Sequence, residues 1–134
     1  MIEYAEILLR LILAVVFGGF IGLEREIVHR PAGIRTHMLV SLGSALFVLV
    51  MIEDFPNEVA RIIAGIATGI GFLGAGTIFK SKSEVHGLTT AASIWAVAGV
   101  GIAVGLGYYT MSVIAVVLVL IVLHLNKAEF FKRL

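Results

Sequence analysis

The chain of 134 residues contains no cysteine, only two prolines and few charged side chains. The absence of cysteine excludes disulfides, thiol nucleophiles and cysteine-based metal or iron–sulfur sites. Charged residues make up 14% and hydrophobic residues 60% of the sequence, and the mean hydropathy is +1.07. A globule of this composition cannot cover itself with polar groups, which predicts an integral membrane protein. The net charge of +1 provides no basic surface for nucleic acid.

Five apolar segments are each long enough to cross a bilayer as a helix. About 30 Å of hydrocarbon requires roughly 20 helical residues. The segments are 7–23, 36–52, 60–79, 88–106 and 109–125. The first segment lacks the basic start and the small-residue cleavage site of a signal peptide. We therefore predict an all-α, polytopic membrane protein, with a single domain of about five transmembrane helices over residues 1–134.

The basic residues are unequally divided between the two sides of this predicted bundle. Those on the side of the first loop, the third loop and the C-terminus are Arg25, Arg30, Arg35, Lys80, Lys82, Lys127, Lys132 and Arg133. The opposite side has only Arg10 and Arg61, near helix ends. Cytoplasmic loops carry an excess of Lys and Arg, so the N-terminus is predicted outside and the C-terminus in the cytoplasm. The basic and aromatic tail, 126–134, is typical of an anchor on anionic membrane lipid.

Glycine pairs at four-residue spacing predict close helix packing in lipid. The glycines concerned are Gly18, Gly22, Gly65, Gly69, Gly71, Gly74, Gly76, Gly101 and Gly105. Two interpretations remain open for the glycine-rich stretch 68–77. Its glycines either admit neighbours on two sides of a central helix, or they break the helix so that freed carbonyls line an ion cavity. Because these faces exceed what a five-helix monomer uses, we expect a homodimer.

Polar residues from four of the segments are expected to meet at the cytoplasmic level of the bundle. They are Glu24, Arg25, Glu26, Arg35, Thr36, His37, Ser41, Thr77, Lys80, Thr89, Thr90 and Ser93. His37, Ser41 and Ser44 follow i, i+4, i+7 spacing, which predicts a polar stripe facing protein. Thr36 and Thr90 each follow a glycine by three residues, which predicts that they accept hydrogen bonds from the first amides of a helix.

Two interpretations of this cluster also remain open. In the first, Glu24 and Glu26 hold a hard cation, which makes magnesium the one candidate cofactor, and His37 is a ligand or proton carrier. In the second, the two carboxylates pair with Arg25, Arg30 and Arg35, and His37 is a satisfied interfacial histidine. Two acids two residues apart do not complete a magnesium coordination shell. No residue set fits a hydrolase triad, a zinc HExxH motif or a phosphate-binding P-loop, so no catalytic residue or enzyme activity is predicted.

Two single residues outside the cluster have structural interpretations. Trp95 lies deep in its segment and is predicted to fill a packing gap. Arg10 is predicted either to extend its charged end toward water or to pair with Glu6 one turn earlier.

Five ordered blocks of the sequence resemble the signature of the MgtC/SapB membrane domain. The blocks are 18–26, 32–37, 43–47, 69–76 and 87–95, and they span nearly the whole chain. The resemblance implies a bacterial or archaeal inner-membrane protein linked to growth under magnesium limitation, and in pathogens to survival inside macrophages. Many members carry a cytoplasmic regulatory domain after the last helix; with the last residue at Leu134, no such domain is expected here.

Two functions are compatible with the sequence. We favour a non-enzymatic regulator that binds other membrane machinery, because Asp and Glu are confined to predicted helix ends and loops. A transporter of a strongly hydrated dication is expected to place acids along its path. The alternative is a transporter of magnesium, another cation or a small solute, acting as a dimer.

Overall fold

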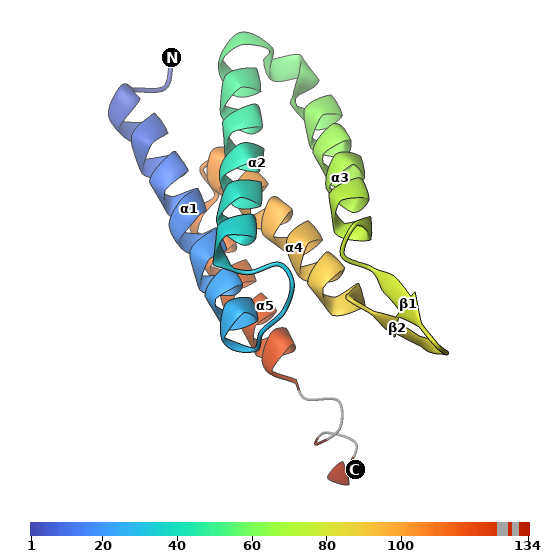
Figure 1. Ribbon diagram of the computed structural model, residues 1–134. Helices are drawn as coiled ribbons and strands as arrows, with labels where there is room; N and C mark the ends of the chain where they lie inside the picture. Colours follow the sequence, from blue (N-terminus) through green and yellow to red (C-terminus); the bar gives the residue numbers. More distant parts are fainter. Residues whose placement is uncertain (126–128, 130–131) are drawn as a thin grey trace.

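The computed structural model describes residues 1–125, 129 and 132–134, and its five α-helices form an up-and-down bundle (Figure 1). The helices are α1 (Tyr4–Ile27), α2 (Ile34–Asp54), α3 (Val59–Ala75), α4 (Leu88–Gly105) and α5 (Tyr109–His124). A short 3-10 helix, η1 (Pro56–Glu58), precedes α3, and an antiparallel hairpin, β1 (Phe79–Ser81) and β2 (Glu84–His86), connects α3 to α4.

The two ends of the bundle carry different connections (Figure 1). One end has the α1–α2 loop, the hairpin and the end of α5, and is called here the hairpin end. The other has the N-terminus and the α2–α3 and α4–α5 turns, and is called the N-terminal end. The predicted lipid anchor in the tail lies mostly outside the described residues.

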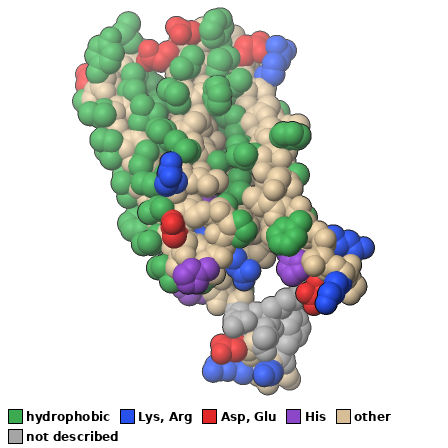
Figure 2. All heavy atoms as spheres, viewed as in Figure 1, with side chains coloured by type: hydrophobic (Ala, Val, Ile, Leu, Met, Phe, Trp, Pro, Cys, Tyr) green, Lys and Arg blue, Asp and Glu red, His purple; other side chains and the backbone are tan. Residues whose placement is uncertain are grey.

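The prediction of five helices is confirmed. Four of them, counting η1 with α3, are long and apolar enough to span a membrane. The fifth, α5, has 16 residues, which corresponds to about 24 Å of helix. Apolar side chains are spread over the outside of the bundle (Figure 2). Large ones are strongly exposed, such as Phe47 at 59% and Phe72 at 87%. These surfaces require a lipid environment, so the chain is a multi-pass membrane protein.

The third predicted segment, 60–79, extends too far. The α3 helix ends at Ala75, and residues 79–81 form the first strand of the hairpin, so the fold is not strictly all-α. Thr77 ends the helical turn with its hydroxyl, which donates to the carbonyl oxygen of Gly74 at 2.7 Å. The broken-helix interpretation of 68–77 is wrong within α3 itself, because the helix is continuous from Val59 to Ala75.

The core of the bundle lies between α1, α2 and α4. The α4 helix packs against all four other helices, and α2 packs against α1, α3 and α4. Fully buried apolar side chains from these elements include Ile21, Val48, Ile94, Val97 and Val104. The α3 helix is peripheral, since only Ile66 and Gly74 of its residues are buried. The expectation that α3 is a central helix is therefore wrong.

Glycines of α1 and α4 allow the backbone of α2 to approach closely on two sides. A Cβ atom placed on Gly18 would lie 2.6 Å from the carbonyl oxygen of His37, and one on Gly22 would lie 2.6 Å from Cα of Ile34. On the opposite side, a Cβ on Gly101 would overlap the carbonyl oxygen of Ser41, and one on Gly105 would lie 2.9 Å from that of Ala45. The packing role predicted for these four glycines is confirmed.

The glycines of α3 behave differently. A Cβ placed on Gly65, Gly69 or Gly71 would meet no described atom within 4 Å. Gly74 faces α4, where a Cβ would lie 3.3 Å from the carbonyl oxygen of Ala91, and Gly76 meets only its own preceding turn. Within the chain, the predicted packing role therefore fails for the first three glycines of α3 and holds for Gly74.

Candidate functional site at the hairpin end

His37 is the centre of the buried polar residues. Its side chain is completely buried in the first turn of α2. The ring Nδ1 lies 2.8 Å from the carbonyl oxygen of Gly33, and Nε2 lies 2.9 Å from Oγ of Ser93 in α4. Since a carbonyl oxygen only accepts, Nδ1 carries a hydrogen and donates it to Gly33. His37 therefore ties the start of α2 to the start of α4.

The hydroxyl of Ser93 has two neighbours that compete for its single hydrogen. It lies 2.8 Å from the carbonyl oxygen of Thr90 as well as 2.9 Å from Nε2 of His37. When Ser93 donates to Thr90, Nε2 has to carry a hydrogen of its own to bond Ser93. When the imidazole is neutral with its hydrogen on Nδ1, Ser93 donates to Nε2 instead. The position of one proton thus selects between two bonding patterns at this junction.

The predicted polar stripe of α2 faces protein, as expected. His37 and Ser41 are fully buried and Ser44 is 2% exposed. Ser44 donates to the carbonyl oxygen of Val40 at 2.8 Å, whereas Oγ of Ser41 has no hydrogen-bond partner among the described residues. Of the two serine hydroxyls in the stripe, that of Ser44 therefore bonds to its own helix, and that of Ser41 stays without a partner among the described residues.

Glu24 and Arg25 form a buried ion pair at the end of α1. The side chains are 10% and 4% exposed, and Nη1 of Arg25 lies 3.4 Å from Oε2 of Glu24. Nε of Arg25 makes no hydrogen bond to any described residue, and Oε2 of Glu24 has no hydrogen bond besides this ion pair. In a buried ion pair with incomplete hydrogen bonding, the desolvation penalty can exceed the attraction between the charges.

The larger network predicted around this pair does not form. Among the described residues no ion pair involves Arg30 or Arg35. Glu26 has another role, because its Oε2 accepts a hydrogen bond of 2.8 Å from the amide of Ile34, the first residue of α2. The capping role predicted for Thr36 and Thr90 is wrong. Helices α2 and α4 begin after Gly33 and Gly87, and neither start has a side-chain cap at the capping residue.

The structure brings together only part of the predicted cluster. His37, Ser41, Thr90 and Ser93 are buried between α2 and α4, and Glu24 and Arg25 lie buried nearby at the end of α1. Four members lie elsewhere: Arg35, Lys80 and Thr89 are exposed, and Thr77 closes the base of the hairpin. Thr36 is half-buried near the start of α2.

A cation site at the two carboxylates finds little support in this geometry. Glu24 pairs with Arg25, and Glu26 accepts the amide hydrogen of Ile34. The part of the chain that the structure describes contains no group of three His, Cys, Asp or Glu residues arranged to hold a metal ion. Magnesium as a cofactor stays a prediction.

A second polar cluster, at the N-terminal end, was only partly predicted. Arg10 pairs with Glu6 at 2.9 Å, which confirms the paired interpretation. The same guanidinium donates to the carbonyl oxygen of Gly105 at 2.8 Å and to the hydroxyl of Tyr109 at 3.3 Å. Tyr109 in turn donates to Glu6. The pairing with Glu6 follows from one-turn spacing, but no sequence signal indicates contacts with residues about 95 positions away.

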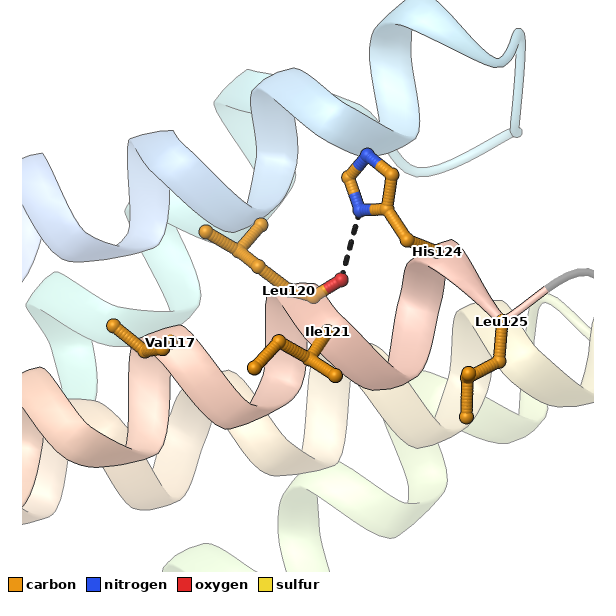
Figure 3. A pocket seen from close by; sticks show the side chains of 5 residues that line it. All are labelled: Val117, Leu120, Ile121, His124 and Leu125. Carbon is orange, nitrogen blue, oxygen red and sulfur yellow. Dashed lines mark hydrogen bonds between the residues drawn. The ribbon is translucent and has the colours of Figure 1, made fainter.

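An apolar hollow lies on α5 (Figure 3). It is lined by Val117, Leu120, Ile121, His124 and Leu125 and has a volume of about 460 Å³. The ring of His124 is engaged, because its Nδ1 lies 2.8 Å from the carbonyl oxygen of Leu120. This surface suits a lipid chain and offers no set of groups for chemistry. Trp95, predicted to fill a gap, is 58% exposed, so that prediction is wrong.

The five-helix bundle, with its glycine-closed core and apolar outer surface, defines a polytopic integral membrane protein. The model of the MgtC family matches residues 11–129, and the chain belongs to this family. The resemblance seen in the five sequence blocks is thereby confirmed.

Curated relatives support the same assignment. The chain is 41% identical to "Putative magnesium transporter YhiD" of Escherichia coli strain K12 over 129 residues, which cover 90% of this chain and 60% of the relative. It is 42% identical to "Protein MgtC" of Salmonella typhimurium strain LT2 over 113 residues, which cover 84% and 49%. The chain thus spans about half to three-fifths of the length of these relatives. No solved structure matches it.

Proposed function

We propose that the chain is a non-enzymatic regulator of other membrane machinery, acting in the inner membrane during adaptation to magnesium limitation. The observation that carries the proposal is the position of the carboxylates. Every Asp and Glu within the five helices lies among the first or last four residues of its helix: Glu6, Glu24, Glu26, Glu53 and Asp54. A path for a hydrated dication through the bundle would have no acidic ligand over its central part.

The packing of the core supports the same function. The backbones of α1 and α4 touch that of α2 at Gly18, Gly22, Gly101 and Gly105, which leaves no space between these helices. The buried hydroxyl of Ser44 bonds to a carbonyl oxygen of its own helix, and that of Ser93 lies between the carbonyl oxygen of Thr90 and Nε2 of His37. A closed core of this kind is suited to a rigid scaffold that contacts a partner, and poorly suited to an aqueous pathway.

Flux measurements separate the regulator from a transporter. The purified protein is reconstituted in liposomes that contain a magnesium-sensitive dye, with a magnesium gradient and an imposed voltage. We expect no flux above that of protein-free vesicles, while a magnesium ionophore added at the end verifies the dye response. We also expect expression of the chain to restore growth in low magnesium to a bacterium lacking its own family member. Flux above the control, or failure to restore growth, would contradict the proposal.

A transporter of magnesium, another cation or a small solute, acting as a dimer, is the second candidate. The observation that favours it is the buried stripe of His37, Ser41 and Ser44, which extends into α2 from the hairpin end. The Escherichia coli relative is also named for magnesium transport. Under this function the liposomes show flux, and His37→Ala removes it, while far-UV circular dichroism verifies that the variant is still helical.

We further propose that the chain forms a homodimer through α3. Gly65 and Gly69 are one turn apart, a Cβ on either meets no described atom, and Phe72 on the same side is 87% exposed. Such a face allows two helices to approach closely in lipid. Because the chain contains no cysteine, a single Thr68→Cys variant should give a disulfide-linked dimer in membranes, whereas Val117→Cys on α5 should not. Equal cross-linking at both positions would exclude a specific α3 interface.

We place the hairpin end in the cytoplasm, because its loops carry most of the basic residues. Single cysteines at Lys82 and at Asn57 lie at opposite ends of the bundle. In intact cells a membrane-impermeant maleimide should label the Asn57→Cys variant and leave the Lys82→Cys variant unlabelled. The reverse pattern would invert the topology.

A further inference from the structure

The β hairpin stands apart from the bundle and exposes most of its side chains. Its strands pair Phe79 with His86, Lys80 with Val85 and Ser81 with Glu84. In Figure 1 the hairpin projects sideways and away from the helices beyond the end of α3. A two-stranded hairpin is at best marginally stable alone in water, so its persistence requires support at its base or on its surface.

The base of the hairpin is fixed by Thr77 and Gly87. Gly87 has a φ of +84°, in the left-handed region that favours glycine, and a Cβ placed on it would overlap the carbonyl oxygen of Thr77. The hydroxyl of Thr77 lies 2.7 Å from the carbonyl oxygen of Gly74 and 3.4 Å from that of Gly87. These contacts therefore fix the orientation of the hairpin relative to the ends of α3 and α4.

The surface of the hairpin combines apolar side chains with unpaired cations. Ile78, Phe79, Val85 and Leu88 are 39%, 56%, 58% and 62% exposed. The rings of Phe79 and His86 stack with centroids 5.0 Å apart. Lys80 and Lys82 are exposed and form no ion pair with any described residue, while the neighbouring Glu84 lies 3.7 Å from His86. Figure 2 shows basic side chains gathered on this projecting part.

The position of the hairpin along the bundle indicates what its apolar and basic side chains contact. The hairpin begins four residues after α3 ends and finishes two residues before α4 begins, so it lies where two spanning helices leave the hydrocarbon. Aromatic and apolar groups at that depth contact the headgroup boundary, and ammonium groups there are attracted to anionic lipid. A thin two-stranded ribbon with apolar side chains beside two lysines matches a lipid surface better than a protein surface, which would require a larger contiguous area.

We propose that residues 78–88 form a binding surface for anionic phospholipid headgroups. The ammonium groups of Lys80 and Lys82 pair with headgroup phosphates, and Phe79 and Val85 rest in the interfacial layer. Because Thr77 and Gly87 fix the hairpin on α3 and α4, lipid binding holds the ends of both helices at a defined depth. This inference depends neither on the regulator nor on the transporter function.

The single tryptophan of the chain provides the measurement. Trp95 is 58% exposed and lies seven residues into α4, about 10 Å along the helix from the hairpin. The protein is reconstituted in phosphatidylcholine with increasing amounts of phosphatidylglycerol that has brominated chains, and in a parallel series with brominated phosphatidylcholine. Quenching of Trp95 fluorescence in the two series gives the relative binding constant of the anionic lipid.

We expect phosphatidylglycerol to bind at least about fivefold more strongly than phosphatidylcholine, since each lysine near an anionic surface contributes about that factor. The double variant Lys80→Ala/Lys82→Ala should lower the ratio toward one, and Lys80→Arg/Lys82→Arg should keep it. Arg61→Ala, which removes an exposed cation at the opposite end, is the matched control and should leave the ratio unchanged.

Three results would overturn the proposal. One is equal quenching of the wild-type protein by the two lipids, the result expected if the hairpin binds an acidic protein instead. Another is a lipid preference that is undiminished in the Lys80→Ala/Lys82→Ala variant. The third is a preference lost equally in Arg61→Ala. The far-UV circular dichroism of each variant verifies that the bundle is intact, so that a loss of lipid preference is not confused with unfolding.

Discussion

Two glycine-rich regions of this membrane protein have opposite surroundings. In the seam between α1, α2 and α4, glycines lie against the backbone of α2 so closely that a single added carbon would overlap it or force it to move. On α3, Gly65 and Gly69 have the same four-residue spacing but meet no described atom within 4 Å. Glycine spacing therefore indicates where a helix can pack closely, and the tertiary structure decides whether the chain itself fills that place.

The largest effect is expected from a large side chain in the seam. Gly101→Leu would push α4 away from the carbonyl oxygen of Ser41, and overpacking of a rigid core costs about 3 kcal/mol or more. We expect loss of the folded protein or a steep drop in stability, measured by chemical unfolding in detergent micelles and followed by Trp95 fluorescence. If Gly101→Leu were as stable as the wild type, the close packing that distinguishes this seam from the α3 face would be contradicted.

A smaller loss is expected from Arg10→Ala at the N-terminal end. Arg10 holds Glu6, Tyr109 and the last carbonyl of α4 together, and removing it leaves a partly buried carboxylate without its cation. We expect a destabilisation smaller than that of Gly101→Leu in the same unfolding experiment. Tyr109→Phe, which keeps the ion pair, should lower the free energy of unfolding about half as much. Equal losses in the two variants would show that the tyrosine hydroxyl, and not the ion pair, provides the stabilisation.

Ser93→Ala tests the link between α2 and α4 at the hairpin end. The substitution removes the partner of Nε2 of His37, which is completely buried. Leaving a buried polar atom unpaired costs about 1 to 2 kcal/mol. Ser44→Ala is the matched control, because Ser44 bonds only to a carbonyl oxygen of its own helix, and it should cost less than 1 kcal/mol. A larger effect at Ser44 would show that His37 is not the junction between the helices.

The smallest effect on the monomer is expected from Gly69→Leu. No described atom lies near an added Cβ at this position, so the free energy of unfolding should change by less than about 0.5 kcal/mol. The same variant should abolish cross-linking through Thr68→Cys, because leucine would separate two copies of α3. A variant that unfolds as readily as Gly101→Leu would show that the α3 face packs within the chain.

The class and the helix count of this protein could be predicted from sequence, because apolar segments of this length have few alternatives to spanning a bilayer. The end of the third segment was predicted wrongly, since Ile78 and Phe79 continue the apolar run while the contacts of Thr77 with Gly74 and Gly87 end the helix. Capping by Thr36 was also wrong, because Glu26 reaches across the loop to the amide of Ile34. The contacts of Thr77 with Gly87 and of Glu26 with Ile34 join residues ten and eight positions apart, and neither separation follows from a helical or strand period.

In the candidate site, too, some features could be predicted from sequence and others depend on tertiary contacts. The burial of His37, Ser41 and Ser44 followed from helical periodicity, which places residues at i, i+4 and i+7 on one side. Glu24 and Arg25 are buried as a pair, while Arg35 and Lys80 are exposed. This difference depends on which helices surround the end of α1. Periodicity within one helix carries no information about the identity of its neighbours.

By itself, the sequence determined that this is a multi-pass membrane protein of the MgtC family with glycine faces suited to close helix contact. Only the tertiary structure decided that the faces of α1 and α4 enclose α2 while that of α3 stays open. The physical reason is that small residues allow close contact with another helix in lipid, but they do not specify which helix that is. The partner is chosen by the arrangement of five helices joined through short turns, one hairpin and the Arg10 contacts at the far end.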